Sequence, residues 1–219
     1  MRAVEPTLEN VAMAAAMLAK GGLVVVPTET VYGVAADATN PKAVARLYEA
    51  KGRPRENPLI VHIACLEDLD RIASHVSPDA RRLAERFWPG PLTMVLPKSD
   101  LVPDIVTAGL PTVAVRYPKH PVAASLITLT GKPLAMPSAN PFQRLSPTRV
   151  EHLDPELLAK TDLVLDGGPC VVGLESTVVD LVEDPPKVLR PGAVTRGEIQ
   201  AAIGRPLGPD QPPKTKARK

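Results

Sequence analysis

The sequence predicts an α/β fold, in which helices cover the faces of a β-sheet. One observation is a set of short, continuously apolar segments such as Leu23-Val24-Val25-Val26, which are typical of strands buried on both faces. These segments alternate along the chain with longer ones that carry helix-capping residues at their ends. The composition, 44% apolar and 23% charged residues, is ordinary for a globular domain. The alternation indicates the fold class but leaves the order of the strands open.

Capping residues frame the predicted helices. Thr7 is placed to cap a helix over residues 8–20, and Gly21 is placed to end it. An Asn-Pro pair at 40–41 begins a second helix, which runs to Lys51 and stops at a glycine. The other predicted helices cover residues 66–74, 78–87, 121–130 and 195–203.

Strands are expected between these helices, and most of them end in small polar or cationic side chains. The predicted strands cover residues 23–26, 59–63, 92–96, 112–116, 134–136, 163–165, 176–180 and 187–190. In the 112–116 strand, Val113 and Val115 point to one face and Arg116 to the other. A buried arginine needs an anionic partner, because unpaired burial of a charge is costly. Ligands of open α/β sheets bind at strand ends, so these side chains are candidate ligand-binding groups.

The length of 219 residues suits one domain with a short appendage. We predict that residues 1–204 fold as one domain and that residues 205–219 form a disordered tail or a truncated linker, because they are basic and rich in proline. The net charge is +2 and aromatic residues make up 3% of the chain. A polyanionic partner is therefore not required, and binding of single-stranded nucleic acid by base stacking is disfavoured.

Cysteine usage and hydropathy favour a soluble, cytoplasmic protein. Cys65 and Cys170 lie far apart without metal-ligand spacing, so we expect free thiols and neither a zinc site nor a disulfide framework. The apolar region from Val11 to Val26 is interrupted by Lys20-Gly21-Gly22. It is too short to span a bilayer and lacks the basic start of a signal peptide.

The stretch from residue 51 to residue 62 concentrates positive charge at the junction of a helix and a strand. Lys51, Arg53 and Arg55 fall within five residues, and two prolines stiffen the backbone around them. Such a cluster is either a solvated turn or an anion site that holds a phosphate-bearing ligand. His62, at the end of the stretch, is either a satisfied structural histidine or a functional one.

Several common motifs are absent from the sequence. There is no GxxxxGK[ST] phosphate loop, no GxGxxG, no HExxH and no GxSxG. If a nucleotide binds, its phosphates must therefore be held by side chains such as Lys51 and Arg53.

Six segments carry a more specific resemblance. They are Pro27-Thr28-Glu29-Thr30-Val31-Tyr32-Gly33, Lys51-x-Arg53-Pro54 with Asn57-Pro58-Leu59, Trp88-Pro89-Gly90-Pro91-Leu92-Thr93, Ser138-Ala139-Asn140, Glu175-Ser176-Thr177-Val178 and Arg190-Pro191-Gly192. Together and in this order, they resemble the threonylcarbamoyl-AMP synthase family with its YrdC-like domain. The resemblance covers residues 8–203 and includes the family's complete catalytic tetrad, Lys51, Arg53, Ser138 and Asn140.

The resemblance implies a twisted mixed sheet flanked by helices, with a concave substrate site. It also implies a nucleotidyltransferase that makes threonylcarbamoyl-AMP and pyrophosphate from L-threonine, bicarbonate and ATP, with Mg²⁺ accompanying the ATP. The product would serve tRNA threonylcarbamoyladenosine modification, so the machinery that transfers the threonylcarbamoyl group, and tRNA or other RNA, are implied partners. No resident metal site and no membrane association are implied.

The resemblance also implies the binding residues. Those implied for ATP are Arg53, Asn57, Thr112, Ser138, Ser146 and Arg190. Those implied for L-threonine are Thr30, His62, Arg116, Met136 and Ser176, with Arg116 on the carboxylate. His62 would act as a base or orient the amine or carbamate.

Two alternatives remain open from the sequence. The first is a non-catalytic, RNA-binding or ribosome-associated YrdC-like module, for which the basic C-terminal residues are the main argument. The second is a related enzyme that forms a carbamoyl-adenylate from carbamoyl phosphate, as in hydrogenase maturation. Longer members of the resembled family carry a further C-terminal domain and a linker that can close over the site.

Overall fold

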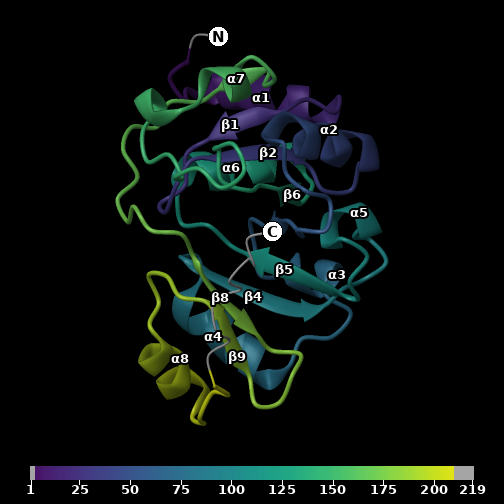
Figure 1. Cartoon of the computed structure of the whole chain (residues 1–219), viewed down its shortest axis with the longest axis vertical. Coiled ribbons are helices and arrows are strands. Elements are labelled where there is room, and N and C mark those ends of the chain that lie inside the picture. The colour runs from purple at the N-terminus through teal and green to yellow at the C-terminus, as the bar shows by residue number, and fades with distance from the viewer. Residues whose placement is uncertain (1–2, 210–219) are drawn as a thin grey trace, which may run out of the picture.

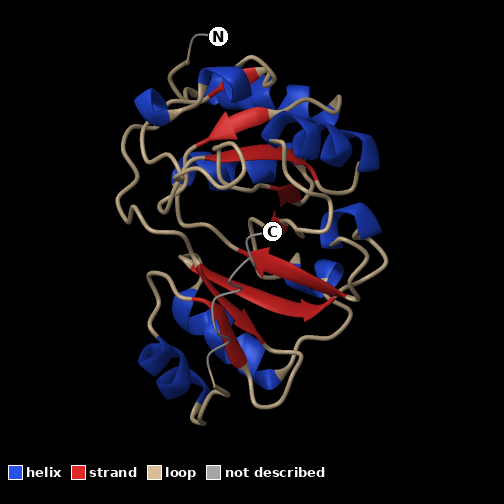
Figure 2. Cartoon of the chain, viewed as in Figure 1, coloured by secondary structure: helices blue, strands red, loops and turns tan. Residues whose placement is uncertain are grey.

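The computed structural model describes residues 3–209, in which the strands join into one mixed sheet (Figures 1 and 2). The strands are β1 (Val24–Val26), β2 (Gly33–Asp37), β3 (Ile60–His62), β4 (Leu92–Pro97), β5 (Thr112–Arg116), β6 (Leu134–Ala135), β7 (Leu163–Val164), β8 (Thr177–Asp180) and β9 (Lys187–Arg190). Their order across the sheet is β7-β1-β2-β6-β3-β5-β4-β8-β9. This confirms the predicted α/β class with a large mixed sheet.

The helices include all those that the sequence predicts and two short ones, α5 and α7, that it does not. They are α1 (Leu8–Ala19), α2 (Pro41–Lys51), α3 (Leu69–Ile72), α4 (Pro78–Phe87), α5 (Asp104–Thr107), α6 (Pro121–Thr130), α7 (Pro155–Leu158) and α8 (Arg196–Ile203), with a 3-10 turn, η1, at Val150–His152. Thr7 and Asn40 cap α1 and α2 with their side chains, as predicted, and Thr195 and Glu198 form a capping box at the start of α8. Gly52 ends α2 in the left-handed conformation. No helix in the described part of the chain is long and apolar enough to cross a membrane.

Successive residues of β1 bury their side chains on opposite faces of the sheet. Val24 and Val26 pack with α1 and α6, whereas Val25 belongs to the larger cluster that includes α2 and α4. A strand covered on both faces needs apolar residues at every position, which is why its sequence is continuously apolar. Figure 1 shows α1, α2 and α6 around β1 and β2, and α4 and α8 around the other end of the sheet.

Part of the predicted tail packs against the folded body. Residues 205–209, which the sequence assigns to a disordered tail or a truncated linker, contact it. Leu207 is buried, and the Arg196 guanidinium donates to the carbonyls of Leu207 and Gly208. Arg205 pairs with Asp79 of α4 at 2.6 Å. Apolar burial and an ion pair thus hold a segment whose composition predicts disorder, while the rest of the predicted tail, residues 210–219, lies outside the described residues.

The sheet brings several strand ends to one region. Strands β3 and β5 run parallel with His62 beside Arg116, so both side chains leave the sheet at the same edge. A backbone bridge joins Gly33 to Ser138, which places the exit of β6 against the start of β2. A side chain at Gly33 would collide with Met136, so glycine is required for this approach.

Candidate active site

Most of the predicted site residues line one cavity at these strand ends. They are Thr30, Arg53, His62, Arg116, Met136, Ser138, Ser176 and Arg190, and Val31, Pro58, Leu59, Ile60, Pro137 and Glu175 complete the lining. Three arginines and a single carboxylate face this space. The lining therefore has a surplus of positive charge and suits an anionic ligand. The anion-site interpretation of the cationic stretch is favoured over a solvated turn for Arg53, which lines the cavity, but not for the exposed Arg55.

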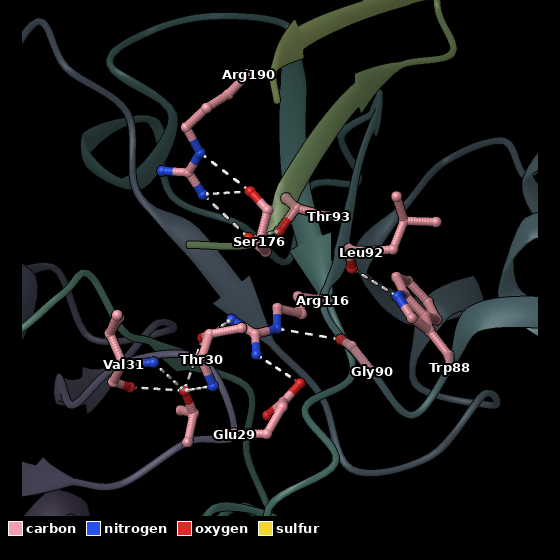
Figure 3. Close-up of polar contacts among 11 residues, drawn as sticks. Glu29, Thr30, Val31, Trp88, Gly90, Leu92, Thr93, Arg116, Ser176 and Arg190 are labelled. Carbon is pink, nitrogen blue, oxygen red and sulfur yellow. Dashed lines mark hydrogen bonds and ion pairs between the residues drawn. The ribbon is translucent and has the colours of Figure 1, made fainter. Parts of the chain in front are cut away.

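Arg116 is held by contacts from two separate segments, residues 29–30 and Gly90 (Figure 3). Its Nη2 lies 2.7 Å from Oε1 of Glu29, its Nη1 donates to Thr30 Oγ1 at 2.9 Å, and its Nε donates to the carbonyl of Gly90 at 3.3 Å. Burial lowers the pKa of Arg116, and the Glu29 carboxylate opposes that shift. The sequence did not identify Glu29 as the partner, although Glu29 stands in the Pro27–Gly33 segment that it singled out.

The Arg116–Glu29 pair is tightly buried but not saturated with hydrogen bonds. Both side chains are about 95% buried, with 5% and 6% of their surfaces exposed. Both carboxylate oxygens of Glu29 lack a well-aligned hydrogen-bond donor among the described residues, so the interaction with Arg116 is a close ion pair without ideal geometry. Arg116 therefore keeps donor capacity for an anion in the cavity.

Arg190 and Glu175 form the opposite wall. Arg190 donates to the Ser176 carbonyl from Nε at 3.1 Å and from Nη2 at 2.9 Å, and its Nη1 pairs with Glu175. Ser146 Oγ donates to Glu175 Oε1 at 2.6 Å, so Ser146 joins the site through this carboxylate rather than by lining the cavity. Gly192 lies close against the backbone of residues 175–177. A side chain at this position would collide with that backbone, so glycine is needed for the close approach.

Lys51 contacts backbone oxygens rather than open space. Its Nζ donates to the carbonyls of Ser138 and Asn140, and the side chain is buried. The Asn140 side-chain amide in turn donates to the carbonyls of Pro141 at 3.0 Å and Arg144 at 2.7 Å. The predicted tetrad is thus brought together, but in this structure Lys51 and Asn140 shape the loop that carries Ser138, and only Ser138 and Arg53 line the cavity.

Arg53 reaches the cavity from the turn that follows α2. Its Nε and Nη2 donate to the carbonyls of Asn57 and Pro58 at 3.1 and 2.9 Å, and its guanidinium lies 5.9 Å from the Phe142 ring centre. Asn57 contributes its backbone carbonyl here and does not line the cavity. Thr112 lies at the opposite end of β5 from Arg116, paired with Pro97, and it is also outside the lining.

His62 is fully buried and uncharged at neutral pH. Its Nδ1 lies 3.3 Å from the carbonyl oxygen of Ile60, which accepts a hydrogen bond from the tautomer that carries a proton on Nδ1. Burial, assisted by the positive charge of Arg116, lowers the pKa of His62 to about 3. A base this weak removes protons poorly at neutral pH, so the geometry favours an orienting role for His62 over a general base.

The buried amine of Lys51 gives a pH-dependent prediction. Burial and the neighbouring Arg53 lower the pKa of Lys51 from 10.5 to about 7. Between these values the unfolded chain binds more protons than the folded chain, so raising the pH stabilises the fold. Relative to Lys51→Met, the wild-type free energy of unfolding should rise by on the order of 1.4 kcal/mol per pH unit between pH 7 and 10. Urea denaturation at several pH values measures this slope, and parallel curves for the two proteins would contradict it.

The residues that surround the cavity do not form a resident metal site. No group of three or more His, Cys, Asp or Glu side chains in residues 3–209 is placed to hold a metal ion. Glu175 faces the cavity but is paired with Arg190. The donor set of the lining, three arginines and one paired carboxylate, suits an anionic ligand.

The fold and the cavity define the class as an α/β protein with an arginine-lined cavity at its strand ends, which suits an anionic ligand. A profile of the Sua5/YciO/YrdC family, described as telomere recombination, matches residues 16–192. The chain belongs to this family, as the six motifs predicted.

Relatives and solved structures agree with this assignment. A threonylcarbamoyl-AMP synthase from Pyrococcus abyssi is 50% identical over 195 residues, which cover 89% of this chain and 57% of the relative. A putative threonylcarbamoyl-AMP synthase from Mycobacterium tuberculosis is 36% identical, with coverage of 91% and 92%. The structure of P. abyssi Sua5 complexed with L-threonine has a TM-score of 0.90 at 48% identity, covering 94% of this chain and 60% of that chain. The chain thus spans just over half the length of the P. abyssi relative.

Proposed function

We propose that this chain is an L-threonylcarbamoyladenylate synthase, which forms threonylcarbamoyl-AMP and pyrophosphate from L-threonine, bicarbonate and ATP. The observation that carries the proposal is the convergence of Arg53, Arg116 and Arg190 on one cavity lined with hydroxyl groups. The similarity to threonylcarbamoyl-AMP synthases and to a threonine-bound Sua5 supports the choice of substrates.

The proposed reaction is an adenylyl transfer, a substitution at the α-phosphorus of ATP without a protein nucleophile. The threonine amine adds to CO₂ derived from bicarbonate and loses a proton, which gives a carbamate. A carbamate oxygen then attacks the α-phosphorus of ATP, a new P–O bond forms, and pyrophosphate leaves. Such a transfer depends on positioning and on stabilisation of negative charge, which arginines and hydroxyls supply.

The arrangement suggests a division of the cavity between the two substrates. We assign the ATP phosphates to Arg53, Ser138 and Arg190, and the threonine carboxylate to Arg116. Asn57, Thr112 and Ser146 would extend the nucleotide subsite, and Thr30, His62, Met136 and Ser176 would surround threonine. Lys51 and Asn140 would act by fixing the 138–140 loop.

Mg²⁺ is proposed as a companion of the triphosphate, held by phosphate oxygens and water. The product would pass to the machinery that modifies tRNA, with the reaction located in the cytoplasm.

The test is threonine-dependent release of pyrophosphate. Purified protein with ATP, Mg²⁺, bicarbonate and L-threonine should release pyrophosphate, and omission of threonine should reduce the rate to background. Release that is independent of threonine would refute the proposal. Salt-dependent RNA binding without any pyrophosphate release would support the non-catalytic alternative.

A further inference from the structure

Two buried threonines lie directly behind cavity-lining hydroxyl groups and have no role in the reaction described above. The Thr28 hydroxyl lies 2.9 Å from that of Thr30. The hydroxyl of Thr93, from β4, lies 2.7 Å from that of Ser176, and Figure 3 shows these two residues side by side. Thr28 is 3% exposed and Thr93 is fully buried, so neither contacts solvent to any extent. The hydrogen bonds of Thr28 and Thr93 determine whether the hydroxyls of Thr30 and Ser176 can donate to a ligand or accept from it.

Thr28 fixes Thr30 as a hydrogen-bond acceptor toward the cavity. The Thr28 hydroxyl donates its single proton to the carbonyl of Val31 at 2.6 Å, because a carbonyl can only accept. Thr28 Oγ1 also accepts from the backbone N–H groups of Thr30 and Val31, both at 3.2 Å. It has no second proton to give, so in its 2.9 Å hydrogen bond with Thr30 Oγ1 the proton comes from Thr30. Thr30 Oγ1 also accepts from Arg116 Nη1 at 2.9 Å. Its proton and one lone pair are used, and what remains is one lone pair.

Thr93 fixes Ser176 with the opposite polarity. The hydroxyls of Thr93 and Ser176 lie 2.7 Å apart. Among residues 3–209, Thr93 Oγ1 has no other hydrogen-bond partner. If Ser176 were the donor, the fully buried proton of Thr93 would have no acceptor, which is costly. Thr93 therefore donates. Ser176 Oγ also accepts from Arg190 Nη2 at 3.0 Å, so both of its lone pairs are used and its proton is left for a ligand.

We propose that Thr28 and Thr93 are positioning residues that give the two sides of the cavity opposite hydrogen-bond polarity. Thr30 accepts only, and Ser176 donates only. This inference rests on the proposed function and deepens it, because it orients the amino acid substrate. The amine or hydroxyl of threonine faces Thr30, and the carboxylate, which we assign to Arg116, also accepts from Ser176.

The reversed orientation is disfavoured on both sides at once. A carboxylate oxygen against Thr30 would meet a lone pair, and an amine donor against Ser176 would meet a proton. Each mismatch leaves a desolvated polar group without a partner, which is the strongest source of discrimination in a buried site. A serine or threonine hydroxyl that is free to rotate could hydrogen-bond to the amino acid substrate in either orientation. The buried threonines remove that freedom.

The experiment compares Thr28→Val and Thr93→Val with Thr28→Ser and Thr93→Ser. Valine keeps the shape of threonine and removes the hydroxyl, whereas serine keeps the hydroxyl. The Michaelis constants for L-threonine and for ATP, and kcat, are measured separately by pyrophosphate release. We expect each valine variant to raise the KM for L-threonine about 3- to 10-fold, with the KM for ATP changed less than about twofold. The serine variants should restore most of the affinity for threonine.

If the wild-type protein shows threonine-dependent turnover, any of three outcomes overturns the inference. They are an unchanged KM for threonine in the valine variants, an equal rise in both Michaelis constants, and a loss in the serine variants as large as in the valine variants. Wild-type protein without threonine-dependent turnover instead refutes the proposed function. Where a valine variant does not fold, cysteine takes its place, because the thiol is of similar size and a much weaker hydrogen-bond partner.

Discussion

Replacing Glu29 with leucine should lower the free energy of unfolding by roughly 3–5 kcal/mol, because the Arg116 guanidinium would then be buried without a counter-charge. Arg116 Nη2 lies 2.7 Å from Glu29, and both side chains are about 95% buried. The Thr30 hydroxyl and the Gly90 carbonyl would remain as partners of Arg116, but neither carries a full charge. Urea denaturation measures the loss as a shift of the unfolding midpoint.

Two comparisons distinguish the stability cost of leaving a buried charge unpaired from the cost of losing an ion pair in general. The exposed pair between Arg55 and Glu49 is a matched control, with 65% and 73% of the side chains exposed, so Glu49→Gln should cost less than about 1 kcal/mol. The double variant Glu29→Leu/Arg116→Leu removes both buried charges and should regain much of the stability lost by Glu29→Leu. A cost for Glu29→Leu as small as that for Glu49→Gln would show that Arg116 does not depend on Glu29.

The sequence predicted most of the fold because its helices and apolar strands carry local signals. The missed strand β2 (Gly33–Asp37) is instructive. Its residues Gly-Val-Ala-Ala-Asp have little intrinsic preference for extended structure, and it forms because β1 and β6 pair with it on both sides. The four-residue helices α5 and α7 were also missed, since one turn of helix has no apolar period to detect.

The cations and hydroxyls of the site could be predicted, but their partners could not. Arg116 and Arg190 are conspicuous as arginines at the ends of apolar strands. Glu175, which holds Arg190, meets it because β8 and β9 pair antiparallel. Glu29, which holds Arg116, lies far from it in sequence, and only the folded sheet brings them together. The same holds for Lys51, whose targets are two backbone carbonyls almost 90 residues downstream. The motif identified Lys51 as a site residue without indicating that it would contact the loop.

Replacing Arg53 with alanine should reduce the kcat/KM of threonine-dependent pyrophosphate release by about 10²- to 10³-fold, because one of the three cavity cations would be lost. The guanidinium faces the cavity and is aligned by the Asn57 and Pro58 carbonyls, so it is preorganised for a phosphate group. The stability should change by no more than about 1 kcal/mol, since only hydrogen bonds to a surface turn are lost.

Arg55 provides the matched control for this variant. It lies two residues from Arg53 in the same turn, its side chain is 65% exposed, and it makes only a long contact of 3.8 Å with Glu49. Arg55→Ala removes the same charge from the same turn and should leave kcat/KM within about twofold of wild type, because an exposed charge is screened by solvent and salt. Steady-state assays at two salt concentrations, with thermal unfolding of each variant, make the comparison. Equal losses for the two variants would mean that the net charge of the turn matters rather than a phosphate contact by Arg53, and a large fall in melting temperature for Arg53→Ala alone would assign that residue a structural role.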